Sequence, residues 1–404
     1  MPPPNDLPVP GTDEQSVSAA LTERLRDEIE ASGGAIDFAR FMERALYEPG
    51  LGYYSGGRRK FGAAGDFVTA PEMGSLFADC LARPCAQILQ ATNGDILEAG
   101  AGSGVLAADL LLALEKLGTL PANYFILELS AELRARQRET LGRKAPHLVA
   151  RVRWLDALPA KGFRGVALGN ELLDAMPVER FRMTAWGLKQ LQVGWTNNRF
   201  ADGNEARAAG QGWPVCGFVW HERTADRTVQ ERMGPICLPE GYISEIGFQA
   251  EAWVHSIADM LEQGVLLLID YGFPRAEFYH AQRRAGTLMC HYRQRAHDDP
   301  LILVGLQDIT AHVDFSAIAH AGQEAGLDLL GYTSQAAFLL DNGLEEIIAA
   351  SDPNDVRAHL ALTSQIKKLT LPHEMGELFK VIALARGIGA PLAGFRQQDR
   401  RARL

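Results

Sequence analysis

One stretch, DILEAGAGSGVL at residues 95–106, decides the fold that we expect. Its apolar start ends in Glu98, three glycines follow at alternate positions, and leucines then recur at helical spacing. This order predicts a strand, a tight turn and an amphipathic helix. Glycine suits such a turn because a Cβ atom would obstruct both the sharp bend and the close approach of a ligand. A glycine-rich loop that binds nothing is the structural alternative.

The spacing of Gly100, Gly102 and Gly104 separates two classes of cofactor. A dinucleotide fingerprint, Gly-x-Gly-x-x-Gly, would need its third glycine at Val105. The pattern Glu-x-Gly-x-Gly-x-Gly, with Glu98 as its acid, instead resembles class I methyltransferases that bind S-adenosylmethionine. In those proteins the acidic side chain faces the cationic methionine end of the cofactor. A nicotinamide-dependent oxidoreductase is therefore disfavoured.

Polar residues also end the next three predicted strands. They are Glu128, Asp156 and the pair Asn170-Glu171. In open parallel sheets ligands bind beyond the carboxyl ends of the strands, so we expect these side chains to converge on one crevice. Glu128 follows Gly104 by 24 residues, close to the spacing of about 20 at which an acid accepts hydrogen bonds from ribose hydroxyls. We assign Asp156 to the adenine amino group, and the pair Asn170-Glu171 to the methionine end of the cofactor or to the substrate.

The order of elements predicts an α/β fold: a class I methyltransferase (Rossmann-like) seven-stranded sheet with an N-terminal helical segment and an inserted β-rich subdomain. Residues 274–312 are expected to be mostly loop, and the basic C-terminal end is expected to be frayed. The expected domains are a disordered leader at 1–15, an N-terminal helical and lid region at 16–92, the first part of the core at 93–177, the β-rich insertion at 178–246, the second part of the core at 247–390, and a tail at 391–404.

Composition limits the classes of partner. The 404 residues, 47% of them hydrophobic, suffice for a sizeable core. A net charge of −10 disfavours nucleic acid as a partner. The most apolar run, near residues 265–269, is far shorter than the roughly 20 residues of a membrane helix, so no membrane insertion is expected. The N-terminus shows neither a signal core nor an Arg-rich transit pattern, which predicts a cytoplasmic location.

The five cysteines indicate no metal site. They are scattered, with no C-x-x-C pair and no histidine at the spacing of zinc ligands. We expect reduced thiols that pack as small buried hydrophobic side chains. They are Cys80, Cys85, Cys216, Cys237 and Cys290.

A wider set of motifs resembles the MidA family, which includes the mitochondrial complex I assembly factor with arginine methyltransferase activity. The match runs over most of the chain. The motifs are Gly52-Tyr53-Tyr54, Gly65-Asp66-Phe67, Thr69-Ala70-Pro71-Glu72, the glycine turn, Asn170-Glu171-Leu172-Leu173-Asp174-Ala175-Met176-Pro177, Asp270-Tyr271-Gly272 and His312-Val313-Asp314-Phe315. The resemblance implies a class I fold, S-adenosylmethionine as donor and a protein substrate, which in the mitochondrial relative is a complex I subunit.

The loop that carries Thr69 has two interpretations. Thr69 and Glu72 have the spacing of a helix capping box, with Pro71 early in the helix. Alternatively, this loop is part of a lid over the cofactor. On that interpretation we predict Thr69 as a cofactor-binding residue.

Carboxylates are the side chains suited to an arginine substrate, because a guanidinium stays protonated at neutral pH. Glu171, helped by Asp174, is predicted to pair with it in a bidentate way and to aim one nitrogen at the methyl group. Second-rank candidates are Asp66, Glu72, His312 and Asp314. A non-catalytic assembly factor that binds S-adenosylmethionine and a methyltransferase for small molecules are the alternatives. The oligomeric state stays open.

Overall fold

The computed structural model describes residues 7–56, 69–197, 217–352 and 354–404. Contacts group the chain into two units. Unit 1 consists of Met1–Arg58, Met176–Phe248 and Tyr279–Ala311, and unit 2 of Arg59–Ala175, Gln249–Phe278 and His312–Leu404. The domain boundaries drawn from the sequence remain a proposal, in which residues 93–177 and 247–390 form the core.

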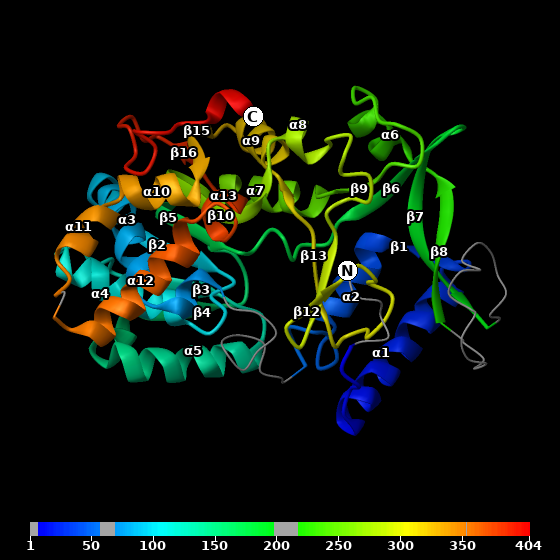
Figure 1. Cartoon of the computed structure of the whole chain (residues 1–404), viewed down its shortest axis with the longest axis horizontal. Helices are drawn as coiled ribbons and strands as arrows, with labels where there is room; N and C mark the ends of the chain where they lie inside the picture. The colour runs from blue at the N-terminus through cyan, green and yellow to red at the C-terminus, as the bar shows by residue number, and fades with distance from the viewer. Residues whose placement is uncertain (1–6, 57–68, 198–216, 353) are drawn as a thin grey trace. The chain divides into compact units, whose positions relative to one another are not determined.

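Unit 2 contains the sheet that the glycine stretch predicts. Figure 1 shows β2, β3 and β4 side by side. The order across the sheet is β4-β3-β2-β5-β10-β16-β15, and the short β14 pairs with the end of β10. Strand β16 runs antiparallel to both of its neighbours, β10 and β15, and the other pairs that the structure describes in this sheet are parallel. The strands are β2 (Asp95–Ala99), β3 (Tyr124–Leu127), β4 (Val152–Leu155), β5 (Phe163–Asn170), β10 (Leu261–Phe273), β14 (Val313–Asp314), β15 (Asp328–Ser334) and β16 (Phe379–Arg386).

Helices cover both faces of this sheet. Side chains alternate between the faces of a strand. On β16, Val381 and Ala383 join the apolar cluster that includes α3 and α4, whereas Leu384 packs against Gly322 of α9. The predicted class I fold is therefore confirmed. The helices around the sheet are α3 (Leu76–Thr92), α4 (Val105–Lys116), α5 (Ala131–Lys144), α7 (Phe248–Met260), α8 (Arg275–Phe278), α9 (Phe315–Glu324), α10 (Gln335–Asp341), α11 (Leu344–Ala349), α12 (Val356–Thr370) and α13 (Met375–Leu378), with 3-10 turns η2 (Ala70–Met73), η3 (Pro146–Arg151) and η5 (Arg401–Arg403).

Unit 1 is built on a second, antiparallel sheet of order β1-β7-β6-β9, with β8 also paired to β7. The N-terminal β1 thus joins strands from the predicted insertion. Aromatic packing supports this joint sheet, because Phe38 and Phe41 of α2 contact Trp220 and Phe218 of β8. Its elements are α1 (Thr12–Ala31), β1 (Ala35–Asp37), α2 (Phe38–Tyr47), β6 (Glu179–Thr184), β7 (Gly187–Thr196), β8 (Gly217–Thr224), α6 (Arg227–Met233) and β9 (Ile243–Ile246).

Residues 274–312 are mostly loop and turn, as expected, but part of the segment is regular. It forms β11 (Met289–Tyr292), β12 (Arg295–His297) and β13 (Asp308–Thr310), a small antiparallel sheet. Cys290 and Tyr292 are buried while His291 between them is half-buried. This alternation is the period of a strand, which the Arg and His residues of the segment obscure.

Three smaller expectations also need correction. Helix α1 begins at Thr12, so residues 12–15 are not a disordered leader. The C-terminal end is packed rather than frayed, because Phe395 is buried against Phe338 and the guanidinium of Arg400 holds Glu377 at 2.7 Å. Cys237 is exposed, whereas Cys80, Cys85 and Cys290 are buried as expected. Cys216 lies outside the described residues.

Candidate active site

The glycine turn between β2 and α4 has the conformation that only glycine adopts readily. The φ angles of Gly100, Gly102 and Gly104 are +69°, +51° and +80°, in the left-handed region that other residues avoid. A Cβ atom on Gly104 would lie 2.9 Å from the Cα atom of Gln137 on α5. The turn therefore requires glycine for the shape of its backbone, and at Gly104 also for close packing against α5.

The sheet order places this turn where open α/β sheets bind ligands. From β2 the chain continues outward to β3 and β4, and then returns to β5 on the other side of β2 (Figure 1). Such a reversal opens a crevice at the carboxyl ends of the two central strands. The glycine turn follows β2, and Glu171 follows β5. Both predicted halves of the site thus come from adjacent strand ends.

Glu98 lies inside unit 2 rather than at its surface. Its side chain is 2% exposed, and the hydroxyl of Tyr124 on β3 donates a hydrogen bond of 2.8 Å to its carboxylate. Burial raises the pKa of Glu98 to about 7, and the bond from Tyr124 opposes that rise. Tyr124 has no place among the predicted site residues, because a tyrosine in a buried strand gives no sign of the acid beside it.

Glu128 and Asp156 are linked through α5. The carboxylate of Glu128 accepts hydrogen bonds from the backbone N–H of Ser130 at 2.9 Å and from Nε2 of Gln137 at 3.1 Å. The guanidinium of Arg134 donates to the backbone oxygen of Glu128 at 2.6 Å and to Asp156 at 2.5 Å. Glu128 is almost fully buried, whereas the carboxylate of Asp156 is exposed. The two predicted nucleoside contacts therefore share one arginine.

The segment before α3 also reaches the glycine turn. The hydroxyl of Ser103 donates a hydrogen bond to the carboxylate of Glu72 in η2. Thr69 directly precedes η2, and its side chain makes no capping hydrogen bond. The capping box is therefore absent. Glu72 instead adds its carboxylate to those of Glu98 and Glu128 near the glycine turn.

The turn after β5 contains a strained residue. Glu171 has φ +49°, a left-handed conformation that costs a residue other than glycine about 1–3 kcal/mol. Its N–H donates to the oxygen of Ile269 on β10 at 2.9 Å, and its carboxylate accepts from Asn170 at 3.2 Å. The Oδ1 atom of Asn170 is buried and has no hydrogen-bond partner in the part of the chain that the structure describes. Strain of this kind persists only where the surroundings hold it.

Asp270, near the carboxyl end of β10, holds this turn. One oxygen of its buried carboxylate accepts from the backbone N–H groups of Leu172, Leu173 and Asp174 at 3.2, 2.8 and 3.2 Å. The other accepts from the N–H of Tyr271 at 2.9 Å. Burial, followed by the charges of Asp174 and Glu171, raises the pKa of Asp270 well above its usual range. The sequence marks Asp270 only as part of a motif, and an apolar strand that ends in an acid is the signal for its role.

Asp174 lies in the interior beside Tyr271. Burial raises the pKa of Asp174 to about 6, and a hydrogen bond from Tyr271 opposes that rise. Its Oδ1 atom has no hydrogen-bond partner among the described residues. A buried carboxylate with a vacant acceptor atom is suited to bind a cation or a hydrogen-bond donor.

The second-rank candidates divide into different roles. Asp314 caps α9, accepting from two backbone N–H groups, and pairs with Arg275 at 3.0 Å. That role is structural. The ring of His312 packs edge-on against Tyr271, with ring centres 5.1 Å apart. Asp66 lies outside the described residues.

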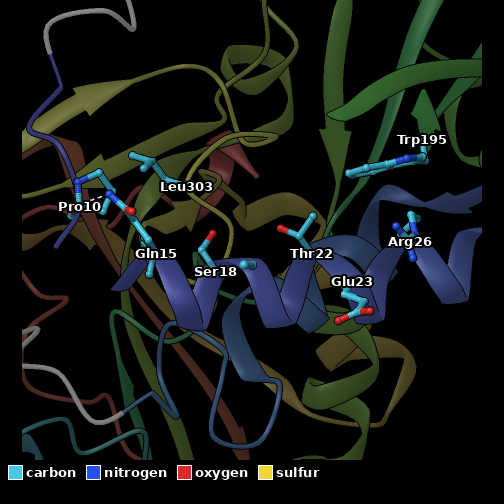
Figure 2. A pocket seen from close by; sticks show the side chains of 10 residues that line it. Pro10, Gln15, Ser18, Thr22, Glu23, Arg26, Trp195 and Leu303 are labelled. Atoms are coloured by element: carbon cyan, nitrogen blue, oxygen red, sulfur yellow. Dashed lines mark hydrogen bonds between the residues drawn. The ribbon is translucent and has the colours of Figure 1, made fainter. Parts of the chain in front are cut away.

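A cavity of about 410 Å³ lies elsewhere, within unit 1. Figure 2 shows Ser18 and Thr22 of α1 on the side of the helix where Leu303 and Trp195 lie. None of the predicted site residues lines it. Across the described residues, no cluster of His, Cys, Asp and Glu is arranged to hold a metal ion, and no helix has the length and apolar character to cross a membrane.

The sheet order, the glycine turn and the acids at the strand ends define an S-adenosylmethionine-dependent methyltransferase of class I. The chain belongs to the Methyltransf_28 family of S-adenosyl-L-methionine-dependent methyltransferases, whose model matches residues 80–333. The resemblance to the MidA family is thereby confirmed.

A solved structure with high similarity supports the cofactor. It is a COG1565 superfamily member from Burkholderia thailandensis, bound to S-adenosyl-homocysteine. The two chains are 51% identical, with a TM-score of 0.92 over 99% of this chain and 100% of that chain. The cofactor of the present protein is therefore S-adenosylmethionine.

Relatives from animals are more distant. The Drosophila melanogaster protein arginine methyltransferase NDUFAF7 homolog, mitochondrial, is 26% identical over 98% of this chain and 93% of its own length. The human protein arginine methyltransferase NDUFAF7, mitochondrial, is 27% identical over 87% of this chain and 80% of its own length. These names contradict the cytoplasmic location expected from the N-terminus, and that expectation is corrected.

Proposed function

We propose that this methyltransferase transfers its methyl group to an arginine side chain of a protein. The observation that carries the proposal is the turn after β5. This turn contains the strained Glu171 and the buried Asp174, and its backbone N–H groups are bound by the carboxylate of Asp270. Relatives over most of the chain carry the name protein arginine methyltransferase, which supports the same class of substrate.

The carboxylates of the turn suit a guanidinium. With a pKa of about 13.8 in water, an arginine side chain is cationic. A carboxylate can bind its planar guanidinium through two parallel hydrogen bonds, which fix the orientation of the group. Glu171 pairs with the two guanidinium nitrogens that do not react, and so fixes the direction of the third. Asp174, with its vacant Oδ1 atom, accepts a hydrogen bond from the reacting nitrogen and takes up the proton that nitrogen loses.

The cofactor, when bound, supplies an electrophilic methyl group on a sulfonium centre. The glycine turn with Gly100, Gly102 and Gly104 gives it a backbone surface. Glu128 accepts hydrogen bonds from the ribose hydroxyls, and Asp156 one from the adenine amino group. The remaining proposed contacts are at the methionine end, from Glu98, Asn170 and Thr69.

We also propose that the protein substrate is a subunit of respiratory complex I. The support is the MidA resemblance, because that family includes a complex I assembly factor. The prediction is tested by mass spectrometry of complex I purified from cells with and without the protein. An arginine methylated only in its presence is the expected result, and identical modification in both would remove complex I from the proposal.

The proposed reaction is tested by following the label from methyl-labelled S-adenosylmethionine. The purified protein is incubated with an extract from cells that lack it, and the labelled protein is hydrolysed to amino acids. Label in methylarginine is the expected result. Label in other residues would contradict the arginine assignment. Label only in small molecules, or bound cofactor without any transfer, would establish one of the two alternative functions instead.

A further inference from the structure

We propose that Gln137 is a positioning residue for cofactor binding, whose side-chain amide ties the glycine turn to Glu128. The inference rests on the proposed contact between Glu128 and the ribose. Gln137 lies in the middle of α5 and is fully buried. No motif marks it in the sequence, because a glutamine within a polar helix resembles an ordinary surface residue.

Three hydrogen bonds fix the orientation of this amide. Its Nε2 atom donates to the backbone oxygen of Gly102 and to the carboxylate of Glu128, both at 3.1 Å. Its Oε1 atom accepts from the indole Nε1 of Trp154 on β4 at 2.9 Å. A carbonyl and a carboxylate only accept, and an indole N–H only donates, so the reverse orientation of the amide would satisfy none of the three partners.

The surroundings hold Gln137 in place from both sides. Its Cα atom packs against Gly104, where a Cβ atom would lie 2.9 Å away. The guanidinium of Arg138 covers the ring of Trp154 at 4.5 Å from the ring centre. One side chain therefore sets the distance between the glycine turn after β2 and the acid after β3.

The bond to Glu128 also favours the charge state that binds hydroxyl groups. Burial raises the pKa of Glu128, and the hydrogen bonds from Ser130 and Gln137 oppose that rise. A carboxylate oxygen has two acceptor sites. The amide of Gln137 occupies one of these sites, and the other is left to accept a hydrogen bond from a ribose hydroxyl.

The test is calorimetry of S-adenosylhomocysteine binding to Gln137→Met, which keeps the bulk of the side chain and removes its hydrogen bonds. The expected result is a dissociation constant raised by about tenfold or more, since two bonds to the turn and to a charged group are lost. The matched control is Gln335→Met. Gln335 is equally buried, and its Nε2 bonds the backbone oxygen of Leu369 on α12, so this variant should bind with unchanged affinity.

A 2′-deoxyribose analogue of S-adenosylhomocysteine separates positioning from simple stability. If Gln137 acts through Glu128, the penalty of Gln137→Met is smaller for the deoxy ligand, and the effects of Gln137→Met and Glu128→Gln are less than additive. A variant that loses thermal stability but binds both ligands as the wild type does would overturn the proposal. If the Glu128→Gln variant discriminates between S-adenosylhomocysteine and its deoxy analogue as the wild type does, the proposed contact between Glu128 and the ribose is wrong. This outcome differs from the one that overturns the role of Gln137.

A milder variant covers the case in which Gln137→Met does not fold. Trp154→Phe removes the indole N–H that orients the amide and leaves an aromatic ring in place. We expect weaker binding of S-adenosylhomocysteine, with partial loss of the ribose discrimination. Unchanged affinity and discrimination in this variant would contradict the proposed orientation of the amide.

Discussion

Replacing Asp270 by Asn should separate methyl transfer from cofactor binding. The carboxylate of Asp270 accepts from four backbone N–H groups, three of them in the turn after β5 and one from Tyr271. An amide has one accepting oxygen and one donating nitrogen. In either orientation, at least one of these N–H groups therefore faces another donor.

The magnitude follows from the burial of that site. A buried N–H group without an acceptor costs about 1–3 kcal/mol in the free energy of unfolding. Part of the cost is offset, because the amide carries no charge into the interior. The strained Glu171 then loses part of what holds it, and a displacement of about 1 Å at a reacting group can lower a rate by about 100-fold. We therefore expect kcat for Asp270→Asn to fall by roughly that factor.

The assay measures release of S-adenosylhomocysteine in the presence of a protein extract, together with calorimetry of cofactor binding. The matched control is Asp109→Asn. Asp109 lies on α4 and is also buried. Its carboxylate pairs with Lys144 of α5 at 2.6 Å and makes none of the bonds that hold the turn after β5. The control should lose stability and keep its rate. Equal loss of rate in the two variants, or a loss of cofactor affinity as large as the loss of kcat in Asp270→Asn, would refute the positioning role.

Three further predictions concern charge and backbone shape. Because burial raises the pKa of Asp174 to about 6, the rate of methyl transfer should rise with pH through about 6 and level off by pH 7 to 8; a rate that falls over this range would contradict its role as proton acceptor. The folded-state pKa of Glu98, about 7, lies above the ordinary value of 4.5, so its contribution to stability is present below about pH 4.5 and is lost as the pH rises through 7. Glu98→Gln should therefore stabilise the cofactor-free protein at pH 8 by up to about 3 kcal/mol and have little effect at pH 4.5, and urea unfolding at the two pH values checks the sign. Gly104→Ala should lower the melting temperature and abolish binding of S-adenosylhomocysteine. The control is Gly118→Ala, where φ is +66° but the space around an added Cβ atom is open, so that this variant should lose stability alone. Similar binding of S-adenosylhomocysteine by both variants would contradict the packing argument.

Much of the sheet could be predicted because local patterns determine it. The apolar runs that end in Glu98, Glu128 and Asn170 give strands in the expected positions, and the glycine spacing identifies the cofactor class. These signals lie within a few residues of one another. They need no knowledge of which segments meet in space.

The supporting contacts of the site could not be predicted in this way. Asp270 bonds a turn almost 100 residues earlier in the chain, and Gln137 bonds the glycine turn 35 residues away. The pairing of β1 with β7 likewise joins residues more than 150 positions apart. A buried amide or carboxylate of this kind has no periodicity of its own, so its role becomes visible only with its partners.

The most direct measurement compares Glu171→Gln with the wild type for transfer of labelled methyl groups into protein methylarginine, at cofactor concentrations that saturate both. The substitution removes the charge of Glu171 and keeps its size, and the glycine turn is untouched. The predicted result is unchanged affinity for S-adenosylhomocysteine with transfer abolished. Methylarginine formed at the rate of the wild type would contradict the account, because the carboxylate after β5 would then have no part in holding the substrate.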